Sequence, residues 1–285
     1  MSSPRLLLCT DLDRTLLPNG SQPESPQARH RFAALAAHPG ISLVFVSGRD
    51  KMLIKQAITN YQLPMPDFVI SDVGTNIYDM RGGKWQVWQQ WQDEIAPDWK
   101  GYSQLQISDL LSDINELRMQ EFSKQNRFKL SYYVPLYVDK SELNQQLEKR
   151  LLDHEINASL VWSVDEPAGI GLLDILPMRA TKLHAVEFLQ AYLGTPRSAS
   201  LFAGDSGNDL PVLASTIPSV LVANAMHSVA KDALAAASEA NNQDYLYLAK
   251  GGFLGMNGNY SAGILEGVAH YHPELVELFS VCAEQ

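Results

Sequence analysis

The sequence predicts an α/β protein with a doubly wound parallel sheet and a smaller inserted α+β domain. Two observations predict the sheet. Short, continuous apolar runs are typical of strands buried on both faces of a parallel sheet. Helical patterns separate these runs, which indicates βα units. A third observation predicts the insertion, because the middle of the chain has a mixed helix and strand pattern and holds all five tryptophans.

Each expected core strand ends at a polar or glycine-containing turn, and helical patterns follow several of these turns. The expected strands are Leu6–Cys9, Ile41–Val46, Phe68–Ile70 and Ser200–Ala203. The expected helices are Gln27–Ala37, Asp50–Tyr61, Lys182–Leu193 and Val229–Ala240. Apolar residues of the second helix recur on one face, as in an amphipathic helix packed on a sheet.

The inserted domain is expected over residues 83–177, between core segments 1–82 and 178–285. Within it, Lys129–Val134 and Gly171–Leu176 are strand candidates, and Ser141–His154 has the pattern of a charged helix. The chain length of 285 residues agrees with a core domain and a second, smaller one.

Composition excludes several classes of protein. Hydrophobic residues make up 46% and charged residues 19%, as in ordinary globular domains. The formal net charge of −10 disfavours nucleic acid and anionic membranes as partners. The presence of only two cysteines, without a CxxC motif, is typical of a reducing compartment. No apolar run approaches the roughly 20 residues that span a bilayer. We therefore expect a cytoplasmic monomer.

Polar residues follow three of the expected strands. The first strand leads into Asp11-Leu-Asp13-Arg-Thr15, the second into Ser47-Gly48-Arg49, and a later one into Gly204-Asp-Ser-Gly-Asn-Asp209. Ligands bind at the carboxyl ends of strands in open α/β sheets. Asp11, Asp13, Asp205 and Asp209 would converge there, repel one another and raise one another's pKa. A hard cation such as Mg²⁺ resolves this repulsion.

A phosphate group would complete such a site. Lys182 begins an expected helix, and its ammonium can neutralise phosphate charge. Ser47 and the backbone amides after it offer hydrogen-bond donors to phosphate oxygens. Each motif by itself is common at the ends of strands and in turns, where it has only a structural role. The ordered set of all four favours a functional site over a structural one.

This ordered set resembles the haloacid dehalogenase (HAD) superfamily of phosphohydrolases, which have a Rossmann-like core and often an α/β cap. The resemblance implies that Asp11 is the nucleophile and that Asp13 is the acid and base. It implies a Mg²⁺ site made by Asp11, the backbone carbonyl of Asp13, Asp205 and Asp209. The resemblance further implies that the phosphoryl group is held by Ser47, Gly48, Lys182 and Asn208.

Four further segments resemble the sucrose-phosphate phosphatase family within that superfamily: Val73–Tyr78, Gln125–Tyr132, Leu173–Pro177 followed by Thr181-Lys182, and Ser261–Tyr271. The resemblance implies sucrose 6-phosphate as substrate. Candidate sugar-binding residues are Thr75 and Asn76, just beyond a core strand, and Lys129 and Asp174, polar residues in strand-like runs. The family usually has an acidic residue at position 76.

Three alternatives stay open. Asn76 leaves room for another glycosyl phosphate, such as a mannosyl- or glucosyl-glycerate phosphate or a fructose-containing one. A phosphohexomutase would share the pair Asp11 and Asp13. A non-catalytic module that senses sugar phosphate would not need Asp11, Asp13 or Lys182. All three residues are present, which argues for an active enzyme. A sugar-phosphate synthase is a possible protein partner.

Overall fold

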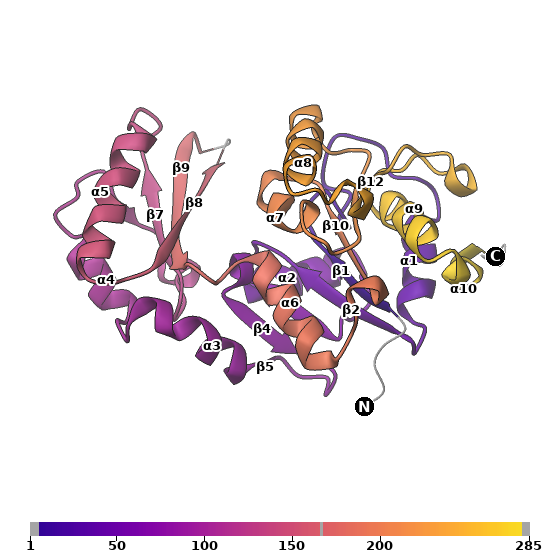
Figure 1. The fold of residues 1–285 in the computed structure, drawn as a ribbon, viewed down its shortest axis with the longest axis horizontal. Helices are drawn as coiled ribbons and strands as arrows, with labels where there is room; N and C mark the ends of the chain where they lie inside the picture. The colour runs from indigo at the N-terminus through magenta and orange to yellow at the C-terminus, as the bar shows by residue number, and fades with distance from the viewer. Residues whose placement is uncertain (1–5, 166–167, 281–285) are drawn as a thin grey trace. The chain divides into compact units, whose positions relative to one another are not determined.

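The computed structural model describes residues 6–165 and 168–280. The chain divides into two compact units (Figure 1). Unit 1 consists of the residues up to Val87 and those from Lys182 onward, and unit 2 is Trp88–Thr181. These divisions lie five and four residues after the expected starts of the insertion and of the second core segment. Trp85 therefore belongs to unit 1, where its ring packs edge-on against Tyr78 at a centroid distance of 5.2 Å.

Unit 1 is built on an eight-stranded sheet in the order β12-β11-β10-β1-β2-β3-β4-β5. The six strands from β12 to β3 are parallel. The strands are β1 (Leu6–Thr10), β2 (Ile41–Val46), β3 (Phe68–Ser71), β4 (Asn76–Asp79), β5 (Gln86–Val87), β10 (Ser200–Gly204), β11 (Ser219–Leu221) and β12 (Leu246–Leu248). The antiparallel edge pair β4 and β5 was not expected from the sequence, because a short hairpin replaces the helical crossover there.

Helices cover both faces of this sheet. Leu6 and Leu8 of β1 point into a core shared with α1, α2 and α9. Strand residues alternate, so Leu7 and Cys9 face the other side, where α6 packs on β3 and α7 on β10 and β11. The helices are α1 (Ala28–Ala36), α2 (Lys51–Asn60), α6 (Lys182–Leu193), α7 (Leu210–Leu213), α8 (His227–Glu239), α9 (Ser261–Tyr271) and α10 (Glu277–Ser280). The doubly wound architecture is confirmed.

The order of the strands creates a switch point at β1. The chain continues from β1 to β2 and β3 on one side, whereas β10, β11 and β12 extend the sheet on the other. The carboxyl end of β1 is joined to β10 by the Asp11 amide, which donates to the Ala203 carbonyl at 2.9 Å. Loops that leave these two strands therefore diverge to opposite sides, and the space between them is where such sheets bind ligands.

Unit 2 contains an antiparallel four-stranded sheet in the order β6-β7-β9-β8, with three helices. Its strands are β6 (Arg118–Met119), β7 (Leu130–Val134), β8 (Ala158–Asp165) and β9 (Ile170–Pro177). Its helices are α3 (Gln89–Ile95), α4 (Gln104–Leu110) and α5 (Lys140–Asp153). Leu143, Leu147 and Leu151 line the buried face of α5, which is the spacing of an amphipathic helix.

Among the described residues, none of the helices is long and apolar enough to cross a membrane.

Helix α9 approaches the sheet more closely than a side chain would allow. A Cβ atom on Gly263 would lie 2.3 Å from the Gly258 carbonyl oxygen, and one on Gly267 would lie 2.6 Å from Val220. Two glycines four residues apart lie on one face of a helix. They let α9 pack directly on β11 and on the segment around Gly258 that precedes α9.

We predict that Gly263→Ala destabilises the protein, although alanine has the higher helix propensity. The new methyl group collides with backbone, so the free energy of unfolding should fall by about 1–3 kcal/mol. Gly82→Ala is the control, because a Cβ there meets nothing within 4 Å. Urea unfolding of both variants measures the difference, and equal stability would contradict this account of α9.

Candidate active site

The candidate active site lies at the carboxyl ends of β1, β2 and β10, where a pocket of about 340 Å³ opens. The three predicted loops and α6 meet here. The lining of the pocket includes Asp11, Asp13, Arg14, Ser47, Gly48, Arg49, Asp205 and Asn208. The structure thus brings together residues that lie up to about 200 positions apart in the chain.

Three carboxylates form the centre of the site. Oxygens of Asp11, Asp205 and Asp209 lie within 4.8 Å of one another, and all three side chains are buried. Burial, together with the charges of Asp209 and Asp205, raises the pKa of Asp11 to about 8. Burial and the Asp209 charge raise the pKa of Asp205 to about 6. A buried set of oxygen ligands with excess negative charge fits a divalent cation.

Lys182 supplies a positive charge to this cluster. Its side chain is 1% exposed, and its Nζ lies 3.2 Å from Asp11 and 2.8 Å from Asp209. Burial by itself lowers the pKa of the ammonium, but these two carboxylates outweigh burial and raise it. Lys182 therefore stays charged. The Nζ also donates to the Asn208 side-chain oxygen at 2.9 Å.

Asp209 is held by the turn that carries it. Its Oδ2 accepts hydrogen bonds from the backbone amides of Asp205 and Ser206, both at 3.1 Å. A Cβ on Gly204 would lie 2.6 Å from that oxygen, so the turn requires glycine there. Because both oxygens of Asp209 are already bonded, this carboxylate is fixed in place and can orient whatever Asp11 and Asp205 bind.

Asp13 lies outside the three-carboxylate cluster and is paired with Arg49. The guanidinium donates to both oxygens of Asp13, at 2.7 and 2.6 Å, and Asn19 donates a further bond of 2.6 Å. Burial alone would raise the pKa of Asp13, but the hydrogen bonds and charge of Arg49 lower it. In this arrangement Asp13 is an ionised carboxylate that can exchange partners with an incoming group.

Three of the residues predicted to hold phosphate, Ser47, Gly48 and Asn208, line the same pocket. Ser47 is 1% exposed, and its hydroxyl accepts a hydrogen bond from the Arg49 amide at 3.2 Å. The backbone of this loop is fixed by Val73, whose amide donates to the Ser47 carbonyl at 3.2 Å. Gly48 follows Ser47 on the pocket wall, and Asn208 is exposed beside Lys182.

The four predicted sugar-binding residues lie in two places. Thr75 and Asn76 are buried at the start of β4 in unit 1. In unit 2, Lys129 precedes β7 and lies 3.5 Å from Asp174 of β9. Ser131, which pairs with Asp174 across the two strands, donates its hydroxyl to that carboxylate at 2.5 Å. Within unit 2, these three side chains form a polar cluster on β7, β9 and the residue that precedes β7.

Three residues were not assigned from the sequence: Arg49 and Arg14, which line the pocket of unit 1, and Ser131 in the polar cluster of unit 2. Arg49 could have been predicted as a site residue, because it belongs to the Ser47-Gly48-Arg49 motif. Its pairing with Asp13 could not, because the two residues lie 36 positions apart. Arg14 stands inside the first motif, and its Nε lies 3.5 Å from Asp205. Nothing in the sequence around Ser131 predicted a role for it, because its hydrogen bond to Asp174 depends on how the two strands pair.

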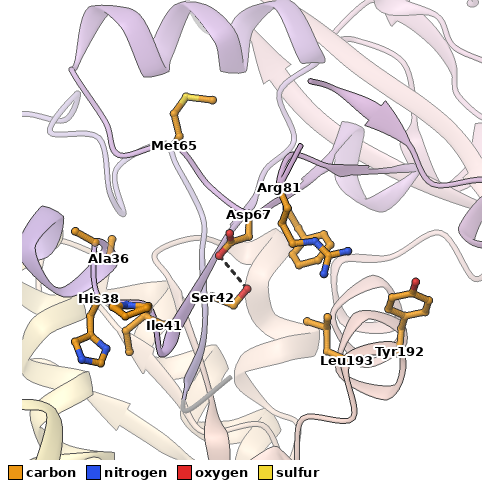
Figure 2. A pocket seen from close by; sticks show the side chains of 12 residues that line it. Ala36, His38, Ile41, Ser42, Met65, Asp67, Arg81, Tyr192 and Leu193 are labelled. Carbon is orange, nitrogen blue, oxygen red and sulfur yellow. Dashed lines mark hydrogen bonds between the residues drawn. The ribbon is translucent and has the colours of Figure 1, made fainter. Parts of the chain in front are cut away.

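A larger cavity, of about 580 Å³, lies at the opposite edge of the unit 1 sheet, beside the amino ends of β2 and β3 (Figure 2). Its guanidinium, from Arg81, is paired with Asp79. Its carboxylate, from Asp67, accepts a hydrogen bond from Ser42 at 3.0 Å. None of the predicted motif residues lines this cavity, so the smaller pocket at the carboxyl ends, which residues of all three motif loops line, is the better candidate for catalysis.

The fold and the site define the class of the protein, a phosphatase of the HAD type. The profile of the sucrose-6F-phosphate phosphohydrolase family matches residues 4–272. The chain belongs to this family, and it is a sugar phosphatase.

Three known proteins illustrate the similarity. A "Putative HAD-like hydrolase" of Nitrosococcus oceani is 55% identical over 270 residues, which is 95% of this chain and 72% of that protein. A "Mannosylfructose-phosphate phosphatase" of Agrobacterium fabrum is 28% identical, over 94% of this chain and 97% of that one. The sucrose-phosphatase of Synechocystis, solved with sucrose and phosphate, has the same fold, with a TM-score of 0.70, 23% identity and coverage of 94% and 98%.

We predict that Asp11→Asn raises the melting temperature in EDTA. The folded state binds a proton at Asp11 more tightly than the unfolded chain, so ionised Asp11 costs stability, and the cost grows as pH rises from about 4 to about 8. The gain from Asp11→Asn should therefore be larger at pH 8 than at pH 5, as measured by thermal unfolding.

Asp13→Asn is the matched control and should behave in the opposite way. The pKa of Asp13 is lowered, so the ionised form stabilises the fold above the unfolded pKa. This variant should lose melting temperature at neutral pH. If both variants gained stability, the assignment of unbalanced negative charge to Asp11 would be wrong.

Proposed function

We propose that this protein hydrolyses a sugar phosphate with Mg²⁺, most readily sucrose 6-phosphate, through an aspartyl-phosphate on Asp11. The observation that carries the proposal is the buried group of Asp11, Asp205 and Asp209 around the ammonium of Lys182. Such a group positions a carboxylate nucleophile beside positive charge, and phosphoryl transfer depends on positioning and charge neutralisation.

The ligand set supports Mg²⁺ as the cation. Asp11, Asp205 and the backbone carbonyl of Asp13 would hold it, and Asp209 would hold it or orient its waters. When bound, Mg²⁺ supplies charge stabilisation to the phosphate oxygens. It would also offset the repulsion among the three carboxylates.

The side chains then divide the chemistry. Asp11 attacks phosphorus, and the bond between phosphorus and the sugar oxygen breaks. Asp13 gives its proton to that oxygen and the sugar leaves. Asp13 next takes a proton from water, whose oxygen attacks phosphorus and releases phosphate from Asp11. Lys182 and Ser47 hold the phosphoryl group throughout, with Gly48 and Asn208 beside them.

Arg49 sets a condition on the first step. Its guanidinium holds Asp13 ionised, and a general acid must carry a proton. Asp13 can therefore act as an acid only after it releases Arg49. Substrate binding would cause this release, because the phosphate group competes with Asp13 for the guanidinium of Arg49.

Sugar selection is proposed for Thr75, Asn76, Lys129 and Asp174. Lys129 and Asp174 present a donor and an acceptor beside the Ser131 hydroxyl, a combination suited to sugar hydroxyls. Asn76 favours a second candidate substrate, a different glycosyl phosphate such as mannosylfructose phosphate. The 28% identical relative named for that activity, which matches 94% of this chain, supports this candidate.

The wider setting is also a proposal. We expect a cytoplasmic monomer that acts on a small molecule and that a sugar-phosphate synthase supplies with substrate. Any contact with a synthase would depend on surfaces outside the pocket. A phosphohexomutase differs from the proposed enzyme by its need for a sugar bisphosphate activator.

The test is phosphate release from a panel of substrates, with Mg²⁺ and after chelation by EDTA. The panel contains sucrose 6-phosphate, mannosylfructose phosphate, glucosylglycerate phosphate, hexose phosphates and p-nitrophenyl phosphate. We expect the highest kcat/KM for sucrose 6-phosphate, loss of turnover in EDTA, and recovery with Mg²⁺. Asp11→Asn should reduce turnover by about 10³-fold or more, since it removes the nucleophile.

The other outcomes separate the rivals. A preference for mannosylfructose phosphate would leave the proposed mechanism unchanged and replace the proposed substrate. Asn76 would then be the first residue to replace by an acidic one. Turnover that needs a bisphosphate would indicate a mutase. Binding without release of phosphate from any substrate would refute catalysis and favour a sensor module.

We further predict that Lys129→Met raises KM for the sugar phosphate about 10-fold or more, because a charge-assisted hydrogen bond contributes about 1.5–3 kcal/mol. The KM for p-nitrophenyl phosphate, which has no sugar, should not change. Lys149→Met is the control, since Lys149 is also paired with an aspartate of unit 2 but is 78% exposed on α5. Equal effects on both substrates would contradict sugar recognition by Lys129.

A further inference from the structure

Asn224 connects two loops that meet behind the site. It follows β11, and its side chain is buried with 3% exposed. Its Nδ2 donates to the Arg14 carbonyl at 2.6 Å, and its Oδ1 accepts from the Tyr260 amide at 2.7 Å. One amide side chain thus joins the loop that carries Asp11 and Asp13 to the residue that precedes α9.

The loop at Arg14 has a conformation that needs such support. Arg14 has a φ of 57°, in the left-handed region that side chains other than glycine disfavour. Its amide donates to the Asn19 side chain at 2.8 Å, and its carbonyl accepts from Asn224. Both peptide groups that flank Arg14 are therefore fixed by asparagine side chains.

These two peptide groups belong to neighbouring residues with roles at the site. The first contains the carbonyl of Asp13. The second contains the amide of Thr15, whose hydroxyl donates to Asp205 at 3.2 Å. A rotation at Arg14 would move the Asp13 carbonyl and the Thr15 hydroxyl together.

The other end of the bridge is equally constrained. Tyr260 is fully buried and has φ 51° and ψ −132°, a rare backbone conformation for a tyrosine. Its hydroxyl donates to the Gln22 carbonyl at 3.0 Å, and a Cβ on Gly20 would lie 2.8 Å from that hydroxyl. Asn224 is therefore anchored to a residue that cannot easily shift.

We infer that Asn224 is a positioning residue for phosphoryl transfer, and this inference rests on the proposed function. It holds the peptide between Arg14 and Thr15 and so sets the Asp13 carbonyl and the hydrogen bond of Thr15 to Asp205. It does not line the pocket and acts through the loop. Its loss should weaken cation binding and lower kcat, while Ser47 and Lys182 still bind phosphate.

The experiment compares Asn224→Ala with Asn242→Ala. Asn242 makes a similar bond, from its Nδ2 to the Ala214 carbonyl at 2.8 Å, away from the site. Two readouts are measured: the Mg²⁺ concentration for half-maximal thermal stabilisation, and kcat and KM for p-nitrophenyl phosphate at saturating Mg²⁺. For Asn224→Ala we expect about 10-fold weaker Mg²⁺ binding and about 30- to 100-fold lower kcat, with KM within about 3-fold.

Asn242→Ala should lose melting temperature and keep both readouts. Asn224→Asp keeps the acceptor for Tyr260 and loses the donor to Arg14, so it should also lower kcat. If Asn224→Ala matched Asn242→Ala in Mg²⁺ binding and kcat, or if only the charged Asn224→Asp lost activity, the inference would be overturned. If the wild-type protein hydrolysed no substrate, the proposed function would be refuted, and with it the role of Asn224 in phosphoryl transfer. The Mg²⁺ readout would then still decide, separately, whether Asn224 positions the cation site.

Discussion

The confinement of three carboxylates in a buried pocket is the constraint on which the rest of the site depends. Asp11, Asp205 and Asp209 lie close together in a buried pocket, where burial and the neighbouring negative charge raise the pKa values of Asp11 and Asp205. Lys182 offsets part of that charge from the start of α6. The negative charge that Lys182 does not offset lowers the stability of the fold, and a bound cation would remove this cost. The same charge would attract the cation to the site.

The sheet makes this confinement possible. At the switch point, the loops after β1 and β10 diverge, and the backbone between them leaves room for carboxylates whose strands are hydrogen-bonded neighbours. The loops themselves are not regular structure. Side chains hold the loop after β1, where Asn19 and Asn224 bond to the backbone of Arg14, whose φ of 57° is disfavoured. Asp72 and Val73, in the turn after β3, also have disfavoured φ values. Strain at such positions persists only where the surroundings determine the conformation.

Much of the fold could be predicted from the chain. The strands β1, β2, β3 and β10 and the helices α2 and α6 lie within a residue or two of their expected positions, because buried parallel strands and capped helices have strong local patterns. The edge strands β5 and β12, and β11 beside β12, have only two or three residues each and carry no such pattern. Trp85 was expected in the insertion, but its packing against Tyr78 keeps it with the core sheet.

By itself, the sequence determined the doubly wound core and the end of the sheet at which its polar motifs meet, because motifs at strand ends converge wherever parallel strands are neighbours. The tertiary structure decided the partners of those groups. Arg49 pairs with Asp13, Ser131 with Asp174 and Asn224 with Arg14 over separations of 36, 43 and 210 positions. Contacts over such distances depend on the packing of whole elements, and no local pattern in the chain encodes them.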